Sequence, residues 1–112
     1  MLTKDELLAQ IKTRCEEVSV PGLEGTLRVR VMSGYDRDAF QKVLRLEGIT
    51  DSAYFGALIA TCVLNEDGTP MFSEEEVETL RGSHAELVRS IGLVCQGING
   101  LGKAAEEAAA KN

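Results

Sequence analysis

The segment Asn65–Val77, which reads N-E-D-G-T-P-M-F-S-E-E-E-V, constrains the fold of this chain more than any other. Its Asp-Gly pair favours a turn, because glycine reaches positive φ without a steric penalty. The proline that follows disfavours helix at the residue before it. Ser73 and Glu76 have the spacing of a capping box, and Phe72 and Val77 flank them as a hydrophobic staple. The chain is therefore predicted to leave one helix, turn, and enter another.

Composition places the chain among small globular proteins. It has 112 residues, of which 44% are hydrophobic and 4% aromatic, with no tryptophan. This length suits one domain, and a core poor in aromatic rings suits packed helices. The net charge of −6 argues against binding to nucleic acid or to an anionic membrane, since both need a basic surface.

Targeting signals and metal sites are not expected. The first ten residues are charged and amphipathic, unlike a signal peptide, and no apolar run approaches the roughly 20 residues of a membrane span. Cys15, Cys62 and Cys95 lack the close pairs of structural zinc sites, so reduced and buried thiols in a cytoplasm are predicted. A zinc site formed with His84 is the less favoured alternative, and no cofactor is expected.

The N-terminal part of the chain is predicted to form a helix and then a hairpin. Thr3 and Glu6 have capping-box spacing and open a helix that should fade near Glu17. One face of this helix is expected to carry Leu7, Leu8, Ile11 and Cys15. Alternating polarity then predicts a small antiparallel hairpin near 19–32, pairing Ser19–Pro21 with Thr26–Met32.

Four further helices are predicted after the hairpin. Ser33 is placed to cap the first of them. Its apolar stripe is expected to be Ala39, Phe40, Val43, Leu44 and Leu46. The segment Ser52–Leu64 is apolar on nearly every side, which is typical of a central helix. A short helix Glu74–Arg81 and a longer one at His84–Ile98, capped by Ser83, complete the set. The predicted class is mainly α (α+β), a compact domain of about five helices over residues 1–102.

The last helix carries a regular apolar stripe. Its members, spaced by 4, 3, 4 and 3 residues, are Leu87, Ile91, Val94, Ile98 and Leu101. Two interpretations stay open: a core-facing stripe of a bundle helix, or a partner-binding surface. The remaining residues 103–112 are rich in Ala and Glu and lack large apolar side chains, so a flexible tail is expected.

No group in the sequence indicates catalysis, and we expect no enzyme activity. The single histidine and the serines and cysteines have no evident base partner in sequence. An EF-hand-like register places Asn65, Asp67, Gly68 and Glu74 at calcium-loop positions. Val63 occupies the first ligand position of that register, and Pro70 the position that is normally apolar, so calcium binding is disfavoured.

Three segments are similar to the tail assembly chaperones of long-tailed, siphophage-type bacteriophages. They are Gly25–Phe40 (G-T-L-R-V-R-V-M-S-G-Y-D-R-D-A-F), Leu64–Leu80 (L-N-E-D-G-T-P-M-F-S-E-E-E-V-E-T-L), and the stretch from S-H-A-E-L-V-R-S-I to the I-N-G-L that ends at Leu101. The resemblance rests on the order, spacing and length of these segments, and none of them carries chemistry.

The resemblance implies a small, late, non-enzymatic viral protein of the host cytoplasm that is absent from the mature virion. Such a chaperone binds the tape-measure protein, keeps it soluble and promotes assembly of the tail tube. The resemblance also implies a homo-oligomer, with the tail-tube protein and a frameshift-extended form of the same chain as further partners. Two alternatives remain: a tail-completion or head–tail connector subunit retained in the virion, and a regulatory adaptor unrelated to phage.

Overall fold

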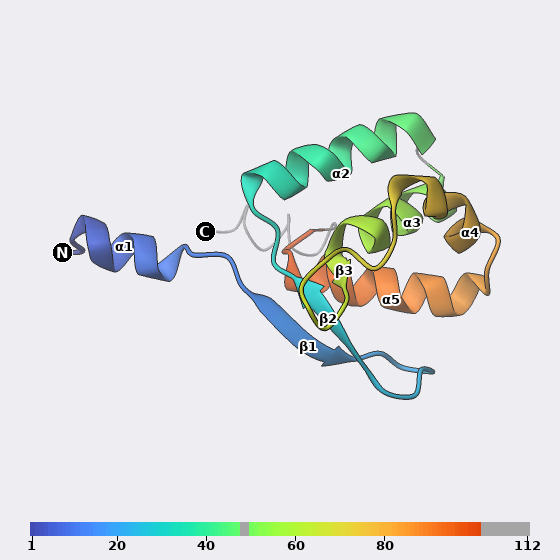
Figure 1. The fold of residues 1–112 in the computed structure, drawn as a ribbon, viewed down its shortest axis with the longest axis horizontal. Helices are drawn as coiled ribbons and strands as arrows, with labels where there is room; N and C mark the ends of the chain where they lie inside the picture. The colour runs from blue at the N-terminus through green and yellow to red at the C-terminus, as the bar shows by residue number, and fades with distance from the viewer. Residues whose placement is uncertain (48–49, 102–112) are drawn as a thin grey trace, which may run out of the picture.

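The computed structural model describes residues 1–47 and 50–101. Within them the chain forms helices and a small antiparallel sheet, which is the predicted mainly helical α+β class (Figure 1). The helices are α1 (Lys4–Gln10), α2 (Gly34–Glu47), α3 (Asp51–Cys62), α4 (Val77–Arg81) and α5 (Ala85–Ile98), and a 3₁₀ turn at Glu74–Glu76 precedes α4. The strands are β1 (Cys15–Ser19), β2 (Thr26–Arg30) and β3 (Val63–Leu64).

Helix α3 forms the centre of the core, as its sequence predicts. It is packed between α2, α4 and α5 (Figure 1). Its buried residues are Ala53, Gly56, Ala57, Leu58, Ile59, Ala60 and Cys62. Leu58 is 0% and Ile59 1% exposed, so the apolar side chains on several sides of this helix are removed from water.

The sheet differs from the predicted hairpin at its first strand. Strand β1 begins at Cys15 and pairs antiparallel with β2, Cys15 facing Arg30 and Ser19 facing Thr26. The expected strand Ser19–Pro21 is therefore wrong in position, because Pro21 has no N–H to give to a ladder and lies in the connection. The second predicted strand is confirmed in β2, although it ends at Arg30.

Strand β3 was not anticipated. It follows α3 directly and adds a third strand to the sheet, with Val29 of β2 facing Val63. The residues Val63 and Leu64 were expected to close the central helix, and they are instead extended and buried. The apolar character of these two residues is compatible with a buried helix end and with a buried strand. Their pairing with β2 makes them a strand.

Helix α1 is shorter than predicted, and it is exposed to solvent. It ends at Gln10 instead of near Glu17, and none of its residues is buried. Cys15, which was expected on its apolar face, lies in β1 and is exposed. The hydrogen bonds between β1 and β2 take these residues away from the helix. In Figure 1 α1 stands apart from the other helices, beyond the N-terminal end of β1.

Helix α2 starts as predicted, but its stripe is only partly used. The Ser33 hydroxyl accepts a hydrogen bond from the Asp36 N–H at 3.1 Å. Phe40 and Val43 are buried against the core, whereas Leu46 is 71% exposed. Ala39 is also exposed, so the expected five-residue stripe is too wide at both ends.

The turn before α4 follows its sequence signals closely. The Ser73 N–H donates to a Glu76 carboxylate oxygen at 2.9 Å, one half of the predicted capping box. Val77 is fully buried and Phe72 packs against the core, as expected for a hydrophobic staple. The chain thereby enters α4 in an orientation that packs it against α3.

Helix α5 begins one residue later than Ser83 capping would require. Its N-cap is His84, whose Nδ1 accepts a hydrogen bond from the Leu87 N–H at 3.3 Å. The Ser83 hydroxyl instead donates to the Thr79 carbonyl at 2.7 Å, at the end of α4. Ser83 is thus occupied by the preceding helix, and the exposed His84 takes over the cap.

Helices α3 and α5 approach each other closely at Gly92. A Cβ at Gly92 would lie 2.3 Å from Cδ1 of Phe55, closer than any real contact. Only glycine leaves room for the Phe55 ring at this point, and the ring in turn stacks edge-on with Tyr54 at 5.2 Å between centroids. Sequence periodicity gave no sign of this contact.

Candidate partner-binding surfaces

The five residues of the α5 stripe lie on one side of α5 and of the turn that follows it. All five of them, Leu87, Ile91, Val94, Ile98 and Leu101, are half-buried. The residues of α5 that face the core fully are different ones, namely Val88, Gly92 and Cys95. The stripe therefore runs along the edge of the core, between the buried and the exposed sides of the helix.

Part of the stripe is covered from within the chain. Ile91, Ile98 and Leu101 pack against the hydrophobic core. Leu87 lies against the connection between β1 and β2, since a Cβ at Gly22 would stand 2.8 Å from its Cδ2. Each side chain nevertheless keeps some surface in contact with water, and Leu93 beside them is 39% exposed. The stripe thus serves the core while leaving an apolar edge open to a partner.

Asn99, directly after α5, holds three elements together and was not singled out from the sequence. Its Oδ1 accepts the Met32 N–H at 2.7 Å, and its Nδ2 donates to the Arg30 carbonyl at 3.2 Å and to the Cys95 carbonyl at 3.0 Å. The same Nδ2 lies 3.6 Å from the Cys62 sulfur. This network fixes the end of the stripe against β2 and α3. An asparagine after a helix usually indicates a cap, which gives no hint of such distant partners.

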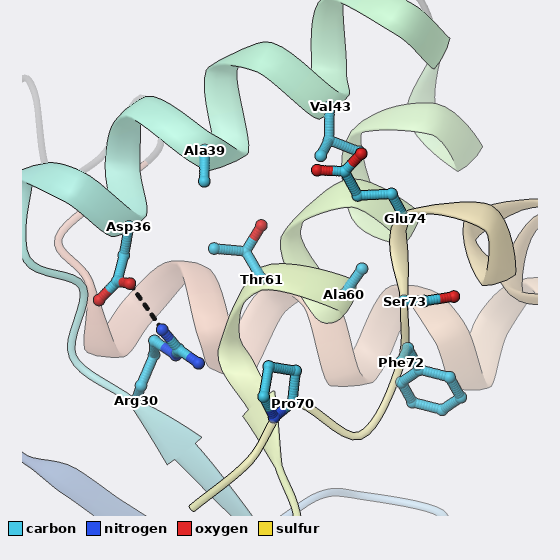
Figure 2. Close-up of a pocket in the computed structure, with 10 residues that line it drawn as sticks. All are labelled: Arg30, Asp36, Ala39, Val43, Ala60, Thr61, Pro70, Phe72, Ser73 and Glu74. Carbon is cyan, nitrogen blue, oxygen red and sulfur yellow. Dashed lines mark hydrogen bonds and ion pairs between the residues drawn. The ribbon is translucent and has the colours of Figure 1, made fainter.

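A pocket of about 250 Å³ opens between α2, the end of α3 and the segment before α4 (Figure 2). At one end Arg30 donates to Asp36 at 2.6 Å. The other walls are largely apolar and include Val43, Ala60 and Phe72. Figure 2 shows Arg30 and Asp36 turned toward each other at this end.

The charged end of this pocket is already organised by the fold. Burial raises the pKa of Asp36, but the Ser33 N–H, the Arg30 charge and the Ser33 hydroxyl outweigh that effect and hold it below its usual value. The Nε atom of Arg30 is buried without a hydrogen-bond partner. The ion pair between Arg30 and Asp36 ties β2 to α2 and engages the Asp36 carboxylate within the fold.

The loop that fits an EF-hand-like register uses its side chains to stabilise itself. An Asp67 carboxylate oxygen accepts hydrogen bonds from the Thr69 N–H at 3.0 Å and from its hydroxyl at 2.6 Å. These two bonds, the hydroxyl one above all, hold the pKa of the exposed Asp67 below its usual value. The Asn65 amide donates to the Thr69 hydroxyl at 3.1 Å. Two residues of that register, Asn65 and Asp67, are thus engaged within the turn.

The cysteines do not gather at one site. Cys62 and Cys95 are buried as predicted, whereas Cys15 is exposed on β1. A hydrogen bond from Cys95 lowers the pKa of Cys62 against the opposing effect of burial, and the same bond, with burial, raises that of Cys95. In residues 1–47 and 50–101 no three His, Cys, Asp or Glu side chains are grouped to hold a metal ion.

Exposed apolar side chains are concentrated at the N-terminus. Among the described residues nine large apolar side chains are exposed, and five of them precede Cys15. These five are Met1, Leu2, Leu7, Leu8 and Ile11. Sequence periodicity marked three of them, Leu7, Leu8 and Ile11, as one face of a helix.

Two further findings bear on the class of protein. In the described part of the chain, no helix has the length and apolar character needed to cross a membrane. Comparison with known proteins finds no matching family model, no matching curated protein and no matching solved structure.

Proposed function

We propose that this protein is a non-enzymatic phage tail assembly chaperone that binds the tape-measure protein, keeps it soluble and promotes tail-tube assembly. The observation that supports this proposal most is the α5 stripe, an apolar edge half-open to water at the border of the core. It agrees with the family resemblance of the sequence, which implies a protein that works by covering another protein's apolar surface.

The physical basis of the proposed activity is docking of helices. A long helical client would aggregate if its apolar stripes stayed exposed, and an amphipathic helix can bury such a stripe in a complementary groove. The chaperone carries a net charge of −6, which would keep a coated client repelled from other coated clients. Several copies along one client gain avidity, so each single contact can be weak.

The proposed place of action is the host cytoplasm, before the virion is complete. The tail-tube protein and a frameshift-extended form of the same chain are proposed as further partners, on the resemblance alone. A chaperone leaves the finished particle, whereas a tail-completion or connector subunit stays in it. Mass spectrometry of purified virions therefore separates the two functions, and detection of this chain at stoichiometric level would contradict the chaperone role.

Co-expression with the tape-measure protein tests the binding surface. We expect the wild-type chain to keep the client in the soluble fraction and to purify with it. Ile98→Glu should abolish co-purification while the domain remains folded, because Ile98 is half-buried. Leu58→Glu, at a position that is 0% exposed, should unfold the domain outright.

Two further variants make this test decisive. Leu46→Glu places the same charge on α2, at a leucine that is 71% exposed, and should leave co-purification unchanged. Val94→Glu repeats the change elsewhere on the α5 stripe and should act like Ile98→Glu. Circular dichroism melts of all variants report folding independently. Unfolding by both stripe variants would assign the stripe to the core, and normal co-purification by both would place the client elsewhere.

A further inference from the structure

The N-terminal arm, defined as residues 1–11, has an apolar face without cover in the described structure. None of the residues of α1 is buried, and Leu7, Leu8 and Ile11 are 46%, 51% and 64% exposed. A helix of seven residues is too short to be stable in water by itself. A well-formed α1 therefore calls for a surface on which this face can pack.

The charges of the arm are distributed unevenly around α1. Leu7, Leu8 and Ile11 share one side of the helix. Lys4 lies on the same side, one turn before Leu8, and Lys12 follows the arm directly. The carboxylate of Glu6 is turned to the N-terminus of the helix, where it accepts a hydrogen bond from the Thr3 hydroxyl at 2.9 Å. Lys4 and Lys12 thus place positive charge beside the apolar face, and Asp5 is the carboxylate near it.

A second surface on the same chain has the complementary character. A hollow of about 90 Å³ lies between the sheet, the segment after β3 and α5. The side chains around it are all apolar and include Leu23, Leu27, Met71, Phe72 and Ile91. A space of this size takes about one aliphatic side chain. The side chains that line this hollow include Ile91, which belongs to the α5 stripe.

The surroundings of this hollow are acidic. A neighbouring depression shares Leu27 and Met71 with it and is lined by Glu17 and Glu66, together with Arg28. The segment from Leu64 to Leu80, which supplies Met71, contains six carboxylates and no lysine or arginine. The positive border of the arm and the acidic border of the hollow are therefore complementary in charge.

We propose that two copies of this chain exchange their arms, with the apolar face of each arm packed over the hollow of the other copy and one aliphatic side chain of that face entering it. A two-fold axis makes the exchange reciprocal, since each chain offers one arm and one hollow. At 1.5 Å per residue the seven-residue helix α1 is about 10 Å long, so with a width of about 10 Å it buries roughly 175 Å² on one side. Two arms and two hollows then bury on the order of 700 Å², the size of a weak interface.

The position of the arm favours another copy over its own hollow. Four residues, 11–14, join α1 to β1 and span about 14 Å at most. Strand β1 then carries the chain toward the connection that holds Leu23 at the hollow, while α1 points away from it at the opposite end of the strand (Figure 1). The arm consequently projects away from the hollow of its own chain (Figure 1).

Sedimentation velocity of the chain alone, over a range of concentrations, tests the arm. The wild type should form a dimer, and Leu8→Glu should weaken dimerisation about tenfold or more. Leu46→Glu, on the exposed side of α2, is the matched control and should dimerise like the wild type. A wild type that stays monomeric at high micromolar concentration, or a Leu8→Glu dimer of unchanged affinity, would overturn the proposal.

The hollow is tested from the other side with Met71→Glu, at a position that is 38% exposed. This variant and Leu8→Glu should each be largely monomeric, but a mixture of the two should form a heterodimer. The first has an intact arm and the second an intact hollow, so one arm can still be bound. Absence of the heterodimer, with both variants folded by circular dichroism, would overturn the assignment of the hollow.

A charge variant keeps the proposal testable if Met71→Glu fails to fold. Lys4→Glu with Lys12→Glu changes two exposed side chains of the arm region and should also weaken the dimer. Added salt should weaken the wild-type dimer in the same direction. An unchanged dimer in the doubly substituted chain would contradict the charge complementarity. These measurements need no client, so their outcome is independent of the chaperone function.

Discussion

Helices α1 and α3 both begin with a threonine cap, but α1 is exposed to solvent and α3 is largely buried. Thr3 caps α1 by accepting the Glu6 N–H at 3.2 Å, and Thr50 caps α3 by accepting the Ala53 N–H at 3.4 Å. No residue of α1 is buried, whereas α3 buries seven of its twelve. A cap decides where a helix starts, and the neighbouring elements decide whether it contributes to the stability of the fold.

This contrast divides the chain into a core and an arm with different roles. The core around α3 is stabilised by burial of apolar surface, which is the main favourable term in folding. The arm contributes no buried residue, so its apolar side chains are available for association. Substitutions of the same kind in α3 and α1 should therefore give very different changes in the free energy of unfolding.

The largest difference is expected for a leucine in each helix. Leu58→Ala should lower the free energy of unfolding by about 2–5 kcal/mol, because Leu58 is 0% exposed and its removal leaves a cavity. Leu8→Ala should change it by less than about 0.5 kcal/mol. Urea denaturation at a concentration where the chain is monomeric measures both. Equal effects would show that α1 is part of the core.

Gly92 tests how tightly α5 packs on α3. Gly92→Ala should cost about 1–3 kcal/mol, since its Cβ would meet the Phe55 ring at 2.3 Å. Gly97, in the same helix, has open space around it, so Gly97→Ala should be neutral or stabilise by about 0.5–1 kcal/mol. Thermal unfolding of the pair checks the prediction. A harmless Gly92→Ala would mean that the two helices separate easily.

Asp36 predicts a dependence of core stability on pH. Its pKa is below the usual value in the folded chain, so its contribution is present above the unfolded pKa and is lost as pH falls through the folded one. Asp36→Asn should cost about 1–3 kcal/mol near neutral pH and remove part of the acid sensitivity. Asp38→Asn, on the exposed side of α2, is the control. Parallel acid curves for wild type and Asp36→Asn would contradict this prediction.

The smallest effect is expected at the two capping threonines. Thr50→Ala should lower the free energy of unfolding by about 1 kcal/mol, because it removes a cap from a helix that belongs to the core. Thr3→Ala should leave global unfolding unchanged and only increase hydrogen exchange in α1. Amide exchange by mass spectrometry, with urea curves, measures the two. A loss of global stability in Thr3→Ala would remove the distinction between arm and core.

Local signals in the sequence predicted the parts of the fold that depend on local interactions. The caps at Thr3 and Ser33 and the capping-box partner of Ser73 were recognisable because donor and acceptor lie three residues apart. The central position of α3 was evident from its apolar composition. Each of these features follows from residues within one or two helical turns.

The features that sequence reasoning missed depend on distant partners. Strand β3 exists because Val63 pairs with Val29, which is far away in the chain. The same holds for Asn99, which bonds to Arg30 of β2, to Met32 just after that strand and to Cys62 of α3. The α5 stripe was visible in its spacing, but its partial cover by the connection at Gly22 was not. Nothing local distinguishes such residues from their neighbours.

The placement of the cysteines allows the rate at which α3 and α5 separate to be measured by thiol labelling. Cys15 is exposed and should react with a thiol reagent immediately, whereas Cys62 and Cys95 are both 0% exposed between α3 and α5. They can react only when these helices part, so the slow phase of labelling measures the rate of that event. A client or a second copy that braces α5 should lengthen the slow phase and leave the fast one untouched.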